Sequence, residues 1–207
     1  LLSLPAAGAD GVVARMLYTT ALRTGLGSAP IGLDRAQPGP AQILLVRRLG
    51  KKVSFELENP RFRASAGSPS EQAAAANAFA TSVLWMGDAV DAPDGRLLVD
   101  IAPFLARDTR NVTAQLNSSG EKGWKLVDGL SAVRAFPLNL EFEARQTYAS
   151  DTPGPEVRNI APDARQVTFV VRHSLMALPE AGYVPRAFDP RGGSFATQIL
   201  DFSAPLG

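Results

Sequence analysis

Two segments of the chain alternate apolar and polar side chains with a period of two, and this alternation constrains the fold more than any other feature. The first segment is 52–58 and the second is 140–148. Their apolar positions are Val53, Phe55 and Leu57, and Leu140, Phe142 and Ala144. A period of two is typical of strands with one buried and one solvated face. The sequence therefore predicts a fold dominated by an antiparallel β-sheet.

Further segments rich in β-branched, aromatic or other apolar residues also favour strands. They are Val12–Leu22, Ile43–Leu49, Arg96–Ile101, Trp124–Val127, Ala132–Phe136, Arg165–Leu178 and Ser194–Phe202. Only Gly50 and Lys51 separate the strand that ends at Leu49 from the one that begins at Lys52. A two-residue loop with glycine first predicts a β-hairpin with a type II′ turn.

One helix is predicted over Pro69 to about Met86. Ser68 is expected to cap it, Pro69 suits the first helical position, and Glu71 completes a capping box. Ala75, Phe79 and Val83 recur every fourth residue and give one apolar stripe. Together with the strands, this predicts an α+β fold in which one main helix packs on a sheet face. Asp108 marks a weaker helix that runs to about Leu116.

Composition bounds the class of protein. The 207 residues suit one domain over 1–207, and 45% hydrophobic with 20% charged residues is typical of a folded globular chain. A net charge of +1 provides no overall field for nucleic acid or an anionic membrane, and no apolar run is long enough for a membrane span. Leu1 in first position, without a signal-peptide pattern after it, leads us to expect a fragment of a longer protein.

Few residues are suited to catalysis or metal binding. The chain has no cysteine, which excludes disulfides, thiolate metal sites and a cysteine nucleophile. Its one histidine, His173, cannot form a His-Glu-x-x-His zinc pair. A serine hydrolase would pair His173 with Ser174 or Ser194, but no Gly-x-Ser-x-Gly elbow is present. On a strand, His173 shares a face with Val167, Phe169, Val171 and Leu175, which favours a structural role. We expect no catalytic residue, no metal ligand and no cofactor.

Two polar clusters have alternative interpretations. Gly25-Leu-Gly27-Ser28 is a turn rather than a phosphate loop, because no Gly-Lys-Ser/Thr follows it. The basic cluster around the hairpin turn (Arg47, Arg48, Lys51 and Lys52) is expected to be a solvated face, with anion binding as the alternative. The proline-rich segment 151–155 is expected to be an exposed, flexible loop.

The stretch 172–195 ends a strand and then breaks into turns. Arg186, Asp189 and Arg191 lie among its prolines and glycines. Such a segment has few conformations to lose on folding. It is either a functional lip or a corner in which Asp189 pairs with a neighbouring arginine.

Several motifs, taken in order, resemble a domain of large bacterial zinc-dependent metalloproteases. They are Ile31-Gly-Leu-Asp-Arg35, Arg61-Phe-Arg-Ala64, Ser82-Val-Leu-Trp85, Leu98-Val-Asp100, Arg107-Asp108 and Phe188-Asp-Pro-Arg191. In that family the domain precedes a met-zincin catalytic domain. The resemblance implies an exported bacterial enzyme, periplasmic or secreted, whose zinc ligands lie outside this chain. The chain departs from the family at Ala36, where glycine is usual, and at Arg172, where the first of two adjacent histidines is common.

The leading hypothesis is a non-catalytic accessory domain that docks on or shapes the catalytic domain of the same polypeptide. Its candidate contact residues are Asp34, Arg35, Gln37, His173, Tyr183, Arg186, Asp189 and Arg191. Docking predicts exposed apolar side chains near the 25–37 loop and the 186–191 turn. The alternative is an independent peptide- or glycan-binding module, which requires a concave site with exposed aromatic residues such as Trp85, Trp124 and Tyr183.

Overall fold

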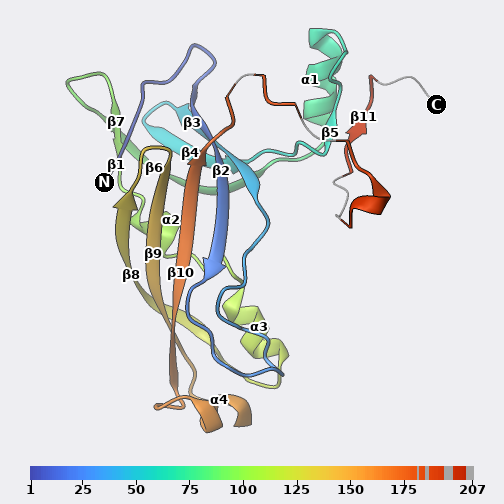
Figure 1. Cartoon of the computed structure of the whole chain (residues 1–207). Coiled ribbons are helices and arrows are strands. Elements are labelled where there is room, and N and C mark those ends of the chain that lie inside the picture. The colour runs from blue at the N-terminus through green and yellow to red at the C-terminus, as the bar shows by residue number, and fades with distance from the viewer. Residues whose placement is uncertain (181, 185–186, 194–197, 204–207) are drawn as a thin grey trace.

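A curved antiparallel sheet dominates the computed structural model of the chain (Figure 1). The structure describes residues 1–180, 182–184, 187–193 and 198–203. Nine strands of these residues form the sheet. From one edge to the other they are β1 (Leu2–Leu4), β7 (Leu97–Val99), β6 (Ser82–Asp91), β4 (Lys52–Leu57), β3 (Gln42–Leu49), β2 (Val12–Leu22), β10 (Gln166–Ala177), β9 (Asn139–Ala149) and β8 (Lys125–Ala135). The predicted antiparallel sheet is confirmed.

Smaller elements surround this sheet. Two short strands, β5 (Phe62–Arg63) and β11 (Leu200–Asp201), pair in parallel as a separate sheet. The helices found in the described residues are α1 (Pro69–Ala78), α2 (Ala102–Leu105), α3 (Val112–Ser118), α4 (Pro155–Ile160) and the 3₁₀ turn η1 (Pro190–Gly192). Within the described residues, no helix combines the length and the apolar character that crossing a membrane requires.

The sheet curls around α2, which supplies the centre of the larger core cluster (Figure 1). Phe104 of α2 is fully buried, and its ring centroid lies 4.8 Å from that of Phe55 on β4 and 5.6 Å from that of Tyr18 on β2. Because β4 and β2 flank β3 on either side, Phe104 packs across three neighbouring strands in the middle of the sheet.

A second core cluster lies at the end of β2, β9 and β10 where α3 and α4 cover the sheet (Figure 1). Ile31 and Leu33, from the loop after β2, are buried in it beside Leu116 of α3 and Val157 of α4. Most of the loop's backbone therefore has little freedom, because its two apolar side chains are inside the protein.

Several predicted strands are confirmed. β2 has the predicted bounds, and β10 and β9 agree with prediction to within a residue or two at each end. The β3–β4 hairpin closes with Leu49 opposite Lys52. Gly50 has φ 62° whereas Lys51 does not have a positive φ, which is the type II′ arrangement.

The predicted helix is wrong in its length and in the surface on which it packs. Its start is confirmed, because the Ser68 backbone N–H donates to Glu71 at 2.7 Å and the Glu71 N–H donates to the Ser68 hydroxyl at 3.4 Å. The helix ends at Ala78, however, and 82–91 is strand β6. The fourth-residue spacing of Phe79 and Val83 was fortuitous, since only Ala75 of α1 is buried. α1 packs beside β5 rather than flat on the large sheet, and it is one of four α-helices in the described residues.

Two further strand predictions need correction. The segments 124–127 and 132–136 belong to one strand, β8, whose register shifts at Val127. The predicted strand from 194 to 202 is limited to β11, and residues 194–197 lie outside the described part of the chain.

The loop predicted over 151–155 leads into α4 and is held in place. The buried carboxylate of Glu121 accepts hydrogen bonds from the N–H groups of Gly154 and Val157 and, at 3.4 Å, from the Trp124 indole. The helix predicted from Asp108 to about Leu116 is found later, as α3 (Val112–Ser118), with Asn111 rather than Asp108 at its N-cap position. The Asp108 carboxylate nevertheless accepts from the N–H groups of Val112 at 2.7 Å and Thr113 at 2.8 Å.

Candidate functional site

A cleft of about 820 Å³ lies between the outer face of β3 and β4 and the segment that carries β5 and α1. We call it the α1 cleft. The sheet contributes Leu45, Arg47, Glu56 and Glu58, and the other wall contributes Asn59, Phe62, Arg63, Gln72, Ala75, Asn77 and Phe79 among others. The outward-facing positions of the β3–β4 hairpin are thus partly covered, which the period-two pattern alone does not indicate.

Most charges in the α1 cleft already have partners. Glu58 accepts both guanidinium hydrogen bonds of Arg15, and this pairing raises the pKa of Arg15. Glu56 accepts from the buried Ser54 hydroxyl, and Arg47 donates to the Asp10 carbonyl at 2.9 Å. The cleft therefore offers amide groups and apolar walls rather than one dominant charge.

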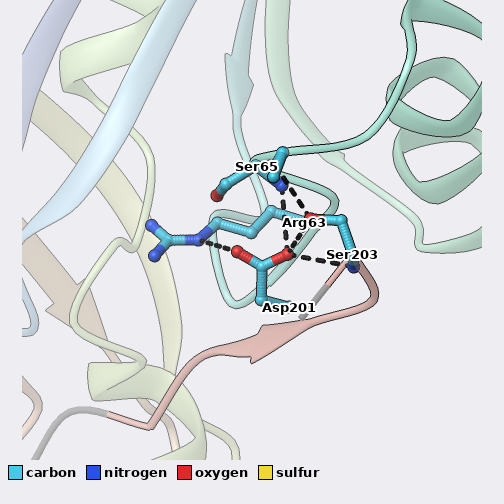
Figure 2. A network of polar contacts seen from close by, with 5 residues as sticks. Arg63, Ser65, Asp201 and Ser203 are labelled. Atoms are coloured by element: carbon cyan, nitrogen blue, oxygen red, sulfur yellow. Dashed lines mark hydrogen bonds and ion pairs between the residues drawn. The ribbon is translucent and has the colours of Figure 1, made fainter. Parts of the chain in front are cut away.

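The wall of the cleft is tied to the end of the chain by Asp201 of β11 (Figure 2). Its carboxylate accepts from the Ser65 N–H at 3.0 Å, from the Ser203 hydroxyl at 2.7 Å and from Arg63 Nε at 3.3 Å. Hydrogen bonds from the side chains of Ser65 and Ser203, and then from the Ser65 backbone, hold the pKa of Asp201 well below its usual range. We call this group the C-terminal clamp.

A stack of three phenylalanines reinforces the C-terminal clamp. The rings of Phe62 and Phe79 lie 3.9 Å apart at 9°, and Phe202 stacks on Phe79 at 5.4 Å. Backbone hydrogen bonds from Leu200 to Arg61 and from Phe202 to Arg63 complete the attachment. The clamp therefore fixes the terminal strand against the base of α1.

Large apolar side chains are exposed along the same C-terminal segment. The exposed fractions are 80% for Val184, 67% for Tyr183 and 61% for Phe202. We call the full set the C-terminal apolar surface: Tyr183, Val184, Phe188, Ile199, Leu200 and Phe202. All six come from residues 183–202, and large apolar side chains exposed to this degree are typical of contact surfaces.

The predicted contact residues of the 25–37 loop lie at the other end of the molecule, near α3 (Figure 1). Asp34 and Arg35 are exposed, and the half-buried Gln37 donates to the Gly32 carbonyl at 3.0 Å. Ala36 has φ 62°, a conformation that favours glycine, so the departure from the metalloprotease pattern falls at a strained position.

The described part of the 186–191 turn leads into η1, which lies near β11 (Figure 1). Asp189 accepts from the Arg191 N–H and, at 2.9 and 3.0 Å, from its guanidinium group, so the turn braces itself as one interpretation predicted. Tyr183 is exposed, and Arg186 lies outside the described residues. The structure thus does not bring this turn and the 25–37 loop together.

His173 lies in the core, on the face predicted from the strand pattern. It is fully buried, and its Nδ1 is hydrogen-bonded to the Tyr18 hydroxyl at 3.0 Å. Burial and the nearby charge of Arg107 lower the pKa of His173 to about 4. A neutral, enclosed imidazole of this kind is not a contact residue for another domain.

The serine beside His173 points to the opposite face of β10. The Ser174 hydroxyl donates to Glu141 at 2.6 Å, and Glu141 also accepts from Arg172. The other candidate, Ser194, lies outside the described residues. Within the described residues, no group of three or more histidine, aspartate or glutamate side chains could hold a metal ion.

The predicted aromatic binding site is not assembled. Trp124 is only 2% exposed, because it packs in the core cluster near α3, and Trp85 packs edge-on against Phe55 at 5.2 Å. Tyr183 is exposed in the C-terminal segment. The aromatic residues of the α1 cleft are instead Phe62 and Phe79, which the sequence placed in a motif and in a helical stripe but not in a binding site.

Two of the four cations in the basic cluster at the hairpin turn are paired with carboxylates. Arg48 pairs with Asp91 at 2.7 and 3.0 Å, and Lys52 pairs with Asp88 at 2.7 Å. Each partner comes from the neighbouring strand β6, so these cations are not gathered around an anion site.

Comparison with known proteins gives one match. No curated protein and no solved structure matches the chain. A family model described as a domain of unknown function (DUF5117) matches residues 41–206, which include both walls of the α1 cleft and the C-terminal clamp. The chain therefore belongs to this family of domains of unknown function.

Proposed function

We propose that the chain is a non-catalytic accessory domain that docks on the catalytic domain of a bacterial zinc-dependent metalloprotease. The observation that carries the proposal is the C-terminal apolar surface, in which six large apolar side chains are exposed on one segment. Exposed apolar area of this kind is stabilised by contact with a second surface.

The C-terminal clamp favours docking over simple exposure of a loose tail. Asp201 and the Phe62–Phe79–Phe202 stack hold β11 on β5, and Asp189 braces the turn before it. A surface that is ordered before it binds loses less conformational entropy on association. The segment is therefore suited to rigid contact.

The nature of the partner rests on the resemblance to the domain that precedes met-zincin catalytic domains. Under this proposal the parent enzyme is exported to the periplasm or secreted, and the catalytic domain of the same polypeptide is the partner. Phe188, the first residue of the motif Phe188-Asp-Pro-Arg191 that is part of the resemblance, belongs to the C-terminal apolar surface.

The full-length protein provides the test. We expect Val184→Ser combined with Phe188→Ser to lower the yield of folded enzyme or its rate of peptide hydrolysis, because apolar contact with the catalytic domain is lost. The matched control is Val83→Ser with Val90→Ser, which are exposed on β6 at 56% and 64%. Equal yields and rates in the two double variants would contradict docking through this surface.

The α1 cleft supports a second candidate, an independent peptide-binding module. Asn77 offers its amide group to the backbone of an extended peptide, and Phe62 offers an apolar wall. Asn59 and Gln72 add carbonyl oxygens, since their amide nitrogens donate to the Ala80 and Gly67 carbonyls. We expect a peptide library to select ligands whose binding is weakened by Asn77→Ala and not by Asn117→Ala on α3. A glycan array serves as the parallel screen. Absence of any selected ligand would remove this candidate.

A further inference from the structure

Strand β8 is a long edge strand of the large sheet. It spans Lys125–Ala135 and, among the described residues, pairs only with β9. Its side chains are exposed over most of its length, including Val127 at 58% and Val133 at 61%. A long edge strand without proline presents unpaired N–H and C=O groups and is a template for pairing with another strand.

The hydrogen-bond pattern shows which groups face outward. The Phe136 N–H donates to the Asn139 carbonyl at 2.8 Å, and residue 134 lies opposite Glu141. In an antiparallel pair, hydrogen-bonded positions alternate along the strand. Even-numbered residues from 128 to 136 therefore bond to β9, and the N–H and C=O groups of residues 129, 131, 133 and 135 face the open edge. Of these, the Gly129 N–H donates to the adjacent Asp128 carboxylate and must exchange that local bond when a second strand pairs.

This edge is complementary to itself. When two copies of β8 pair antiparallel about a two-fold axis, one residue lies on the axis opposite its own copy. A residue a given number of positions before it then lies opposite the residue the same number of positions after it in the second copy. Centring the pair on residue 131 places Asp128 opposite Arg134 of the second copy, and Arg134 opposite the second copy's Asp128. Centres at neighbouring residues place neither charge opposite its counterpart.

The same register agrees with the hydrogen-bonding pattern. Residue 131 faces outward, so 131 and its symmetry mate form a hydrogen-bonded pair, flanked by two pairs between residues 129 and 133. Asp128 and Arg134 then occupy non-hydrogen-bonded positions, where opposing side chains lie closest. Beyond them, Phe136 stands opposite the second copy's Leu126, near the bulge at Val127, where regular pairing ends.

We propose that β8 is a homotypic interface, and that a second copy of this chain pairs with it antiparallel about residue 131 to make one continuous sheet across a dimer. The occupant is a second copy because the charge pattern fits its own two-fold image. Asp128 and Arg134 are exposed and form no ion pair within the described residues. Asp128 Oδ1 accepts from the Gly129 N–H at 2.7 Å, which leaves its Oδ2 for Arg134 of the second copy.

Charge reversal tests the register. Sedimentation velocity of the full chain over a wide concentration range should show a monomer–dimer equilibrium. Asp128→Arg and Arg134→Asp should each weaken dimerisation by about tenfold or more, because two attractive pairs become repulsive. The double variant should restore it. Asp34→Arg, an exposed aspartate far along the chain from β8, is the control for net charge.

A proline substitution tests the backbone part of the interface. Val133→Pro removes an outward-facing N–H and leaves the bonds to β9 in place, so it should abolish the dimer while circular dichroism stays unchanged. A wild-type chain that is monomeric at all concentrations overturns the proposal. So does a dimer that survives both single charge reversals, or a double variant that fails to restore it. None of these changes touches the C-terminal apolar surface, so the outcome is independent of the docking proposal.

Discussion

At the scale of single residues, His173 shows how a polar group is kept inside this sheet. The Tyr18 hydroxyl is hydrogen-bonded to Nδ1 of His173, whereas Nε2 of His173 has no hydrogen-bond partner within the described residues. Burial also raises the pKa of Tyr18 to about 12, so this pair is neutral at physiological pH. The face on which His173 lies follows from strand alternation in its own segment. Its partner could not be predicted, since Tyr18 is 155 residues away.

His173 should make the stability of the protein depend on pH. Its pKa is about 4 in the folded chain and 6.5 when unperturbed, so the unfolded state binds the proton more tightly. Stability is therefore complete above about pH 6.5 and falls as the pH drops toward 4. We expect the free energy of unfolding in urea to fall by about 2 kcal/mol between pH 8 and pH 5.

The matched variant is His173→Gln, which can still bond to Tyr18 but does not titrate. Its unfolding free energy should be nearly flat over the same pH interval. A slope as steep as that of the wild type would show that another group is responsible. Asp201 does not interfere, because its lowered pKa places its titration in more acidic solution.

At the scale of elements, the strands with period-two alternation were predicted, and the α1–β6 boundary was not. The capping box fixes where α1 begins, because Ser68 and Glu71 are only three residues apart and satisfy each other's backbone groups. The end of α1 depends on β6 pairing with β4, a contact between segments about thirty residues apart. Local spacing cannot reveal such a contact, so Phe79 and Val83 suggested a longer helix.

Removing the cap should loosen α1 alone. Ser68→Ala is expected to cost about 1 kcal/mol of local stability, because the Glu71 N–H loses its acceptor. Hydrogen exchange should become faster in the first turn of α1 while β2 and β10 stay protected. Ser70→Ala is the comparison, since the Ser70 hydroxyl meets only that of Ser68. Equal exchange in the two variants would show that the cap contributes nothing.

At the scale of the whole molecule, the C-terminal clamp is the feature that no sequence pattern predicted. Asp201 reaches Arg63 and Ser65 across more than 130 positions of sequence. By contrast, the Asp189–Arg191 brace is local and was predicted as one of two alternatives. The sequence therefore predicted the candidate surface only in part. It identified the turn that contains Asp189 and Arg191, but not the contacts by which the C-terminal clamp fixes β11 against the base of α1.

Breaking the C-terminal clamp should free the chain end without unfolding the sheet. We expect Asp201→Ala to make the segment after residue 182 more sensitive to protease, with little change in the melting temperature. Because the pKa of Asp201 is lowered, the wild-type segment should stay protected above about pH 4 and lose protection in more acidic solution. Asp34→Ala is the control, and equal cleavage of both variants would refute the role of Asp201.

The pairing of β2 with β10 has a consequence for synthesis on the ribosome. Tyr18 and its neighbours bond on one side to β3, which emerges soon afterwards, and on the other to 171–177, which emerge last among the sheet strands. Until then, β2 in the nascent chain lacks its partner β10 and remains an unpaired, largely apolar edge strand. Chains truncated before Ala177 should consequently aggregate or bind chaperones, whereas chains that include Ala177 can complete the sheet.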